Sequence, residues 1–197
     1  MIASCLITLA LVAAEASVTP IVVAVVAPTD VTDSLVNQIC AEAAAIWMPA
    51  GIALEWSRGV SKDQARRPSI EVMIDNRRAP VGRDGALGWL TFTSDGPDRF
   101  IHLSRASAEG LLRGTPGLND ATIASHEAFI SRALGRALAH ELGHYILRSK
   151  THTPRGLMRA FWTSEQTFGL RRDGVELTPL EQATAAGLLR TEAPRVE

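Results

Sequence analysis

Residues 140–158 read HELGHYILRSKTHTPRGLM, and the interpretation of the whole chain starts from this stretch. His140 and His144 are four residues apart, so on a helix their side chains lie on nearly the same face, about 6 Å apart. Both imidazoles can then bind one zinc ion at about 2.0–2.1 Å. Glu141 lies about 100° around the helix from His140, where its carboxylate can take a proton from a zinc-activated water. The pattern H-E-x-x-H therefore predicts a hydrolytic zinc site.

Such a site needs a third protein ligand, and the sequence offers two candidates. His152 follows His144 by eight residues, in a loop that can fold back under the helix. Glu165, 21 residues after His144, would instead supply a carboxylate from a following helix. We favour His152, because imidazole is the commoner zinc ligand and the Thr-His-Thr-Pro loop is short. Met158 follows in PRGLM, where a turn can bring its thioether beneath the metal.

The segment before the motif has the pattern of a long amphipathic helix. Within residues 121–147 the apolar side chains recur at spacings of three and four, which forms one stripe that faces the core. Asn119 or Asp120 is expected to cap the start of this helix. Leu142 should pack inward, and Gly143 should leave room beside the metal.

The remaining elements are short strands and two further helices. The expected strands are residues 21–27, 52–56, 69–75, 89–93 and 99–104, the last two forming a hairpin. The expected helices are residues 31–48 and 178–189, the second with a capping box of Thr178 and Glu181. This order predicts an α+β fold, in which a twisted mixed sheet packs against the N-terminal helix and the long helix, with a helix at the C-terminus.

Residues 140–158 resemble the signature of the metzincin clan of zinc peptidases, H-E-x-x-H-x-x-G-x-x-H followed by a methionine turn. The resemblance assigns the three zinc ligands to His140, His144 and His152. It assigns the general base to Glu141 and the methionine of the turn to Met158. The chain departs from the signature in two ways: no glycine occurs from Tyr145 to His152, and the third histidine comes two residues late. The family's glycine lets the helix turn sharply toward the third ligand. Here the two extra residues are expected to make a wider turn.

The resemblance implies a zincin-like domain that acts as a zinc-dependent endopeptidase, with one catalytic Zn²⁺ and a peptide or protein substrate. Domains of this clan align extended substrate along an edge strand that precedes the active-site helix. Residues 86–93 (ALGWLTFT) are in the right place for that strand, but they also fit an ordinary hairpin strand with Trp89 and Phe92 in the core. The alternative function is a zincin-like module that binds zinc without proteolytic turnover.

The N-terminus predicts export. Residues 1–16 form an apolar run that ends in Ala14-Glu15-Ala16, the A-x-A pattern of a signal-peptidase site. We therefore expect a signal peptide at 1–16, a zincin-like domain at 17–197, and a periplasmic or extracellular location. An uncleaved N-terminal anchor is the lesser alternative, since the run is short for a membrane span and no stable span is expected. Cys40 would then be the only cysteine, and its setting predicts a buried apolar thiol.

Length and charge narrow the remaining possibilities. A chain of 197 residues suits one ordinary domain. The formal net charge is −1, and the basic residues are spread along the chain instead of clustering in one stripe. We therefore expect no nucleic-acid partner, and the sequence does not determine the oligomeric state.

Overall fold

The computed structural model describes residues 20–59, 70–80, 82, 85–118 and 122–192; the expected signal peptide lies outside them, and export stays a prediction. The strands are β1 (Ile21–Val26), β2 (Leu54–Arg58), β3 (Ile70–Asp75), β4 (Gly88–Thr93) and β5 (Gly96–Ser104). The helices are α1 (Asp33–Trp47), α2 (Arg105–Arg113), α3 (Ile123–Ile146), α4 (Ser164–Phe168) and α5 (Pro179–Glu192), with a 3-10 turn, η1 (Met48–Ala50), after α1.

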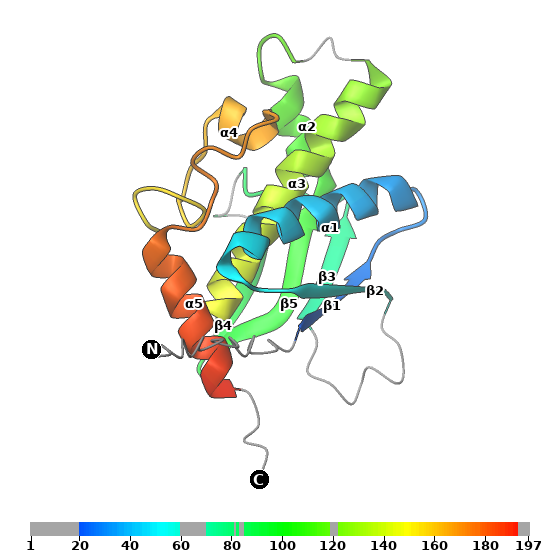
Figure 1. Cartoon of the computed structure of the whole chain (residues 1–197). Helices are drawn as coiled ribbons and strands as arrows, with labels where there is room; N and C mark the ends of the chain where they lie inside the picture. The colour runs from blue at the N-terminus through cyan, green and yellow to red at the C-terminus, as the bar shows by residue number, and fades with distance from the viewer. Residues whose placement is uncertain (1–19, 60–69, 81, 83–84, 119–121, 193–197) are drawn as a thin grey trace, which may run out of the picture.

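The strands form one five-stranded sheet in the order β2-β1-β3-β5-β4 (Figure 1). β1 pairs in parallel with β2 and β3, β3 pairs in parallel with β5, and β4 pairs antiparallel with β5. The expected mixed sheet is confirmed, and it is mostly parallel. Because β4 ends this order, no described strand pairs with its other side.

Helices α1 and α3 cross each other on one face of the sheet (Figure 1). One row of buried apolar residues runs across four strands beneath them: Val25 pairs with Val72, Val72 with Ile101, and Ile101 with Leu90. These side chains join the helices in a single hydrophobic core. The position of α3 is therefore determined by its burial against both the sheet and α1.

The crossing of the two helices depends on a glycine. A β-carbon at Gly135 would lie 2.5 Å from Cβ of Glu42 and 2.9 Å from the carbonyl oxygen of Ile39, both on α1. One turn further along α3, the buried indole N–H of Trp47 donates to the carbonyl oxygen of Ala139 at 3.1 Å. These contacts hold α1 against α3 at the point where the HELGH segment begins.

Of the two helix caps predicted from the sequence, one is confirmed and the other is wrong. Thr178 and Glu181 form the expected capping box at α5: each backbone N–H donates to the side chain of the other residue, at 2.7 and 3.3 Å. The expected cap of the long helix was wrong. Thr122 caps α3 by accepting a hydrogen bond from the N–H of Ser125 at 3.3 Å. Threonine is also a preferred capping residue, and Thr122 directly precedes the first turn, whereas Asn119 and Asp120 lie outside the described residues.

Cys40 lies on the buried side of α1, with 7% of its surface exposed. Burial raises the pKa of its thiol to about 11, and the nearby charge of Arg58 opposes this shift. The thiol is therefore protonated at neutral pH, which makes it a poor nucleophile. The expectation of a buried apolar thiol is confirmed.

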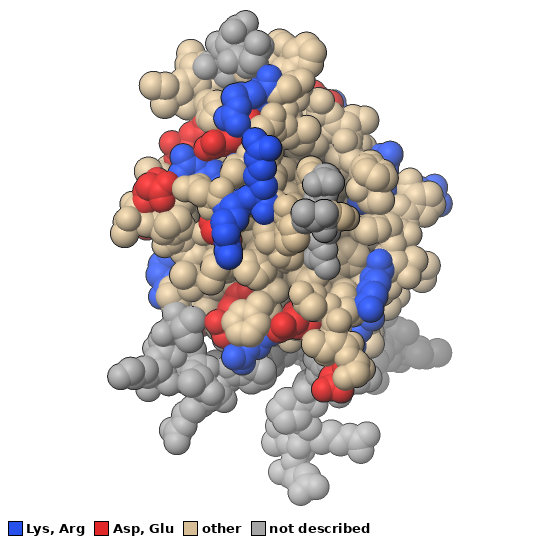
Figure 2. Space-filling view, turned by 180° about the vertical axis from the view of Figure 1, so that it is seen from behind, with Lys and Arg blue, Asp and Glu red and all other residues tan. Residues whose placement is uncertain are grey.

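On the face opposite to that of Figure 1, basic side chains form a row down the upper half, and acidic side chains lie to its left and below it (Figure 2). Among the described residues, ion pairs join Arg105 to Glu109 at 2.9 Å and Arg99 to Glu71 at 3.2 Å. Within the described ranges, no helix is both long and apolar enough to cross a bilayer. The expectation of no nucleic-acid partner stays a prediction.

Replacing Gly135 with alanine tests the helix crossing. Alanine favours an isolated helix by about 1 kcal/mol, but the new β-carbon collides with α1, so we expect Gly135→Ala to lower the free energy of unfolding by about 1–3 kcal/mol. Urea unfolding followed by circular dichroism measures the change. Gly187→Ala in α5 is the matched control: no atom lies within 4 Å of its β-carbon, and stability should rise or stay unchanged. Equal stability of the two variants would contradict the assigned crossing.

Candidate metal centre

Three histidine side chains converge near the C-terminal end of α3. His140 and His144 lie on successive turns of the helix, and His152 comes from the loop that follows it. The ring centres are 4.6 Å apart for His140 and His144, 5.2 Å for His140 and His152, and 5.0 Å for His144 and His152. One ligand nitrogen from each ring lies within 4.8 Å of the others, and this is the one such group among the described residues.

Backbone carbonyls orient the two helical imidazoles. Nδ1 of His140 lies 2.8 Å from the carbonyl oxygen of Leu157, and Nδ1 of His144 lies 2.6 Å from that of Ser149. A carbonyl oxygen can only accept, so each Nδ1 carries the proton and each Nε2 keeps its lone pair. Hydrogen bonds of this kind fix the ring orientation and increase the basicity of a ligand histidine.

Burial keeps these rings neutral. It is the main cause that lowers the pKa of His140 to about 3, with the neighbouring His144 as the second cause. Burial also lowers the pKa of His144. Neutral imidazole is the form that binds metal, and three imidazoles are a donor set that suits a tetrahedral zinc ion with one further position for water or substrate. The residues present therefore fit zinc.

The structure brings His152, and not Glu165, to the other two histidines. His152 is exposed, whereas the two helical histidines are buried. Glu165 lies in the first turn of α4, where its carboxylate packs against the backbone of Gly169. It does not belong to the group of ligand atoms. Of the two candidates for a third ligand, His152 is therefore the one whose ligand atom lies near those of His140 and His144.

The turn between the helix and His152 begins with a residue in a left-handed conformation. Leu147 ends α3 with ordinary helical dihedral angles, and Arg148 then adopts a left-handed conformation with φ of 50°. Glycine usually occupies such a position, since a residue with a β-carbon pays about 1 kcal/mol there. The helix therefore ends at an arginine in the left-handed conformation, and the expected wider turn to His152 stays a prediction.

Met158 is buried against Gly143 of α3, and its expected place beneath the metal stays a prediction. The N–H of Thr153 donates to the carbonyl oxygen of Met158 at 2.8 Å, which closes the turn, and the Met158 side chain is 1% exposed. A β-carbon at Gly143 would collide with the Met158 sulfur and lie 3.1 Å from its methyl carbon. Gly143 therefore makes room for the thioether, where the sequence suggested room beside the metal itself.

Glu141 is buried next to His140 and faces strand β4. Its side chain is 7% exposed. A β-carbon at Gly88 of β4 would lie 3.1 Å from Cγ of Glu141. The absence of a side chain at Gly88 thus lets the carboxylate residue pack closely under the edge strand.

Two aromatic rings border the histidines. Trp162 packs edge-to-face against His140 with ring centres 5.6 Å apart, and Phe92 of β4 does the same against His144 at 6.4 Å. The indole Nε1 of Trp162 is buried and has no hydrogen-bond partner among the described residues. Trp162 was not predicted from the sequence, because it lies in an irregular segment whose pattern has no periodicity.

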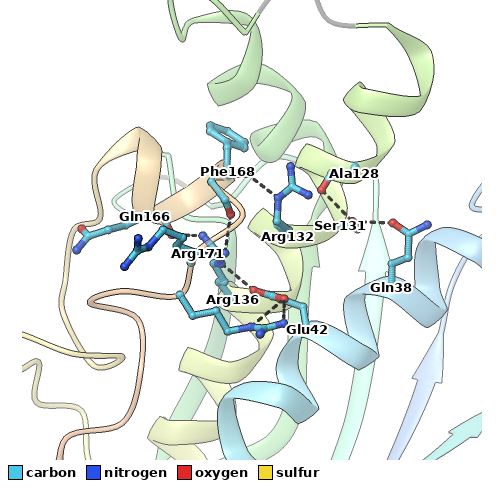
Figure 3. A network of polar contacts seen from close by, with 11 residues as sticks. Gln38, Glu42, Ala128, Ser131, Arg132, Arg136, Gln166, Phe168 and Arg171 are labelled. Atoms are coloured by element: carbon cyan, nitrogen blue, oxygen red, sulfur yellow. Dashed lines mark hydrogen bonds and ion pairs between the residues drawn. The ribbon is translucent and has the colours of Figure 1, made fainter.

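A buried arginine anchors the segment that carries Trp162. Arg136, one turn before His140, is fully buried and donates to the carboxylate of Glu42 at 2.9 Å (Figure 3). Its other nitrogens donate to the carbonyl oxygens of Gln166, Gly169 and Arg171. Arg172 donates to the second oxygen of Glu42 at 2.6 Å. This role of Arg136 was not predicted either, although Arg136, His140 and His144 share the same four-residue spacing.

Comparison with known proteins supports the fold. No protein-family model matches the chain, and no curated protein matches it in sequence. The crystal structure of archaemetzincin from Methanopyrus kandleri matches with a TM-score of 0.52, covering 87% of this chain and 96% of that one. The fold is similar to that of archaemetzincin. Sequence identity is 15%, so the likeness to archaemetzincin concerns the fold alone.

Replacing Gly143 with alanine tests the packing beneath the metal centre. The new β-carbon displaces the Met158 thioether and the turn that it closes, so we expect Gly143→Ala to bind zinc about tenfold more weakly. Competition with a chromophoric chelator measures the dissociation constant. Gly110→Ala in α2, where no atom lies within 4 Å of the β-carbon, is the matched control and should bind zinc like the wild type. Unchanged affinity in Gly143→Ala would contradict the assigned packing.

Proposed function

We propose that the protein is a zinc-dependent endopeptidase whose metal ligands are His140, His144 and His152. The observation that carries this proposal is the convergence of the three imidazoles within 4.8 Å, beside the buried Glu141. A zinc ion held there would polarise the scissile carbonyl and lower the pKa of a water molecule to about 7. Three protein ligands are typical of a catalytic zinc site, whereas a structural site is usually closed by four.

Glu141 would act as the general base. It follows His140 directly on the helix, so its carboxylate lies beside the ligands instead of among them. The carboxylate would accept a proton from the attacking water and later donate it to the nitrogen of the leaving amine, as the C–N bond breaks. Its burial under β4 limits the access of bulk solvent to that proton.

Strand β4 would hold the substrate. Its side away from β5 pairs with no described strand, and an extended peptide would add to the sheet along that side. Gly88 at one end of β4 packs against Glu141, and Phe92 near the other end packs against His144. A peptide that lies along this edge would therefore pass the metal centre with its backbone near the general base. This arrangement supports cleavage within an extended chain.

Replacing Glu141 with glutamine tests the reaction. The amide cannot take the proton, so we expect Glu141→Gln to retain one zinc ion per chain and to cleave an unstructured protein about 100- to 10,000-fold more slowly than wild type. Zinc is measured by atomic absorption and cleavage by the appearance of new amino termini. Wild-type protein that binds zinc but cuts nothing across a broad peptide library would refute the proposal and leave a zinc-binding module.

A matched pair of variants tests which residue is the third ligand. His152→Ala should weaken zinc binding, whereas Glu165→Ala should leave it unchanged, since Glu165 lies outside the group of ligand atoms. The opposite result would transfer the third ligand to Glu165.

A further inference from the structure

The side chain of Arg148 reaches from the end of α3 to the tip of the β4–β5 hairpin. Its nitrogen Nη2 donates to the carbonyl oxygen of Asp95 at 3.1 Å. Gly96, the next residue, has a φ of 126°, and a β-carbon there would lie 2.8 Å from the same nitrogen. The glycine at the tip of the hairpin thus provides the space that the guanidinium occupies.

The backbone of Arg148 adopts a conformation that is unfavourable for a residue with a side chain. Arg148 is the one residue other than glycine with a positive φ among those described, although glycine would adopt its φ of 50° at lower cost. An unfavourable conformation of this kind persists where the surrounding structure holds the residue in place. The contact with the hairpin is one interaction that a glycine at this position could not make.

A second contact joins the same two parts of the chain. Nζ of Lys150 lies 5.1 Å from the centre of the Phe92 ring on β4, and that ring packs against His144. Between these two basic residues, the carbonyl of Ser149 accepts the hydrogen bond from His144. The loop that leads to His152 is therefore fastened to the hairpin by two side chains and to the metal centre by its backbone.

We propose that Arg148 is a positioning residue that joins the loop of the third ligand to the β4–β5 hairpin, so that metal binding and the position of the β4 edge are coupled. This inference rests on the proposed function, in which His152 is a ligand and β4 receives the peptide. Coupling between two sites is reciprocal. Metal binding should therefore restrain the hairpin, and a peptide held along β4 should raise the affinity for metal.

Hydrogen exchange of the hairpin amides, residues 88–100, tests the coupling with zinc as the only added ligand. In wild type, saturating zinc should slow exchange near Asp95 and Gly96 about tenfold. Arg148→Ala and Arg148→Gly should both lose this slowing and bind zinc about tenfold more weakly. The two variants separate the side chain from the backbone, because only glycine also relieves the left-handed conformation. Arg155→Ala removes an exposed arginine from the same region and should behave like wild type.

Three other outcomes would each overturn the inference. If zinc slows exchange in Arg148→Gly as in wild type, the side chain does not transmit the effect, and the proposed endopeptidase stands unaltered. If zinc binds to wild type without any change in the hairpin, the coupling is absent, and the proposed function again stands. If wild type binds no zinc, both the inference and the proposed function fail.

Discussion

The metal centre depends on a mutual constraint between one helix and the loop after it. The hydrogen bonds from His140 to Leu157 and from His144 to Ser149 run from the helical rings to backbone on either side of His152. The loop thus orients the first two imidazoles, and the helix in turn determines where the loop can place the third. Neither part forms the centre alone. A metal ion would add its binding free energy to contacts that the folded chain already makes.

The rest of the fold holds that helix at a defined place and depth. Gly135 lets α1 approach one side of α3, and the row of apolar side chains across the sheet buries the other side of α3. The buried Arg136 then fastens the segment after the methionine turn to the same face that carries the ligands. A buried charge is costly without partners, so the carboxylate of Glu42 and the three carbonyl oxygens around Arg136 must stay in place. This requirement makes the network a source of rigidity near the histidines.

Much of this arrangement was predictable from local patterns. The four-residue spacing of His140 and His144 needs only helical geometry, and the alternating strands and the capping box at Thr178 follow from equally local rules. Contacts between residues distant in sequence determine three other features. These are the left-handed conformation of Arg148, the space for its guanidinium at Gly96 and the position of Trp162. Helix α2 was also missed, because it is short and presents few apolar positions. Local periodicity carries no signal for features that only tertiary packing selects.

The central claim is that three imidazoles bind one zinc ion, and X-ray absorption at the zinc K-edge measures this directly. Protein loaded with one equivalent of zinc should show three imidazole nitrogens at about 2.0–2.1 Å and a fourth light atom. A sulfur scatterer at about 2.3 Å, or fewer than three imidazoles, would contradict the account.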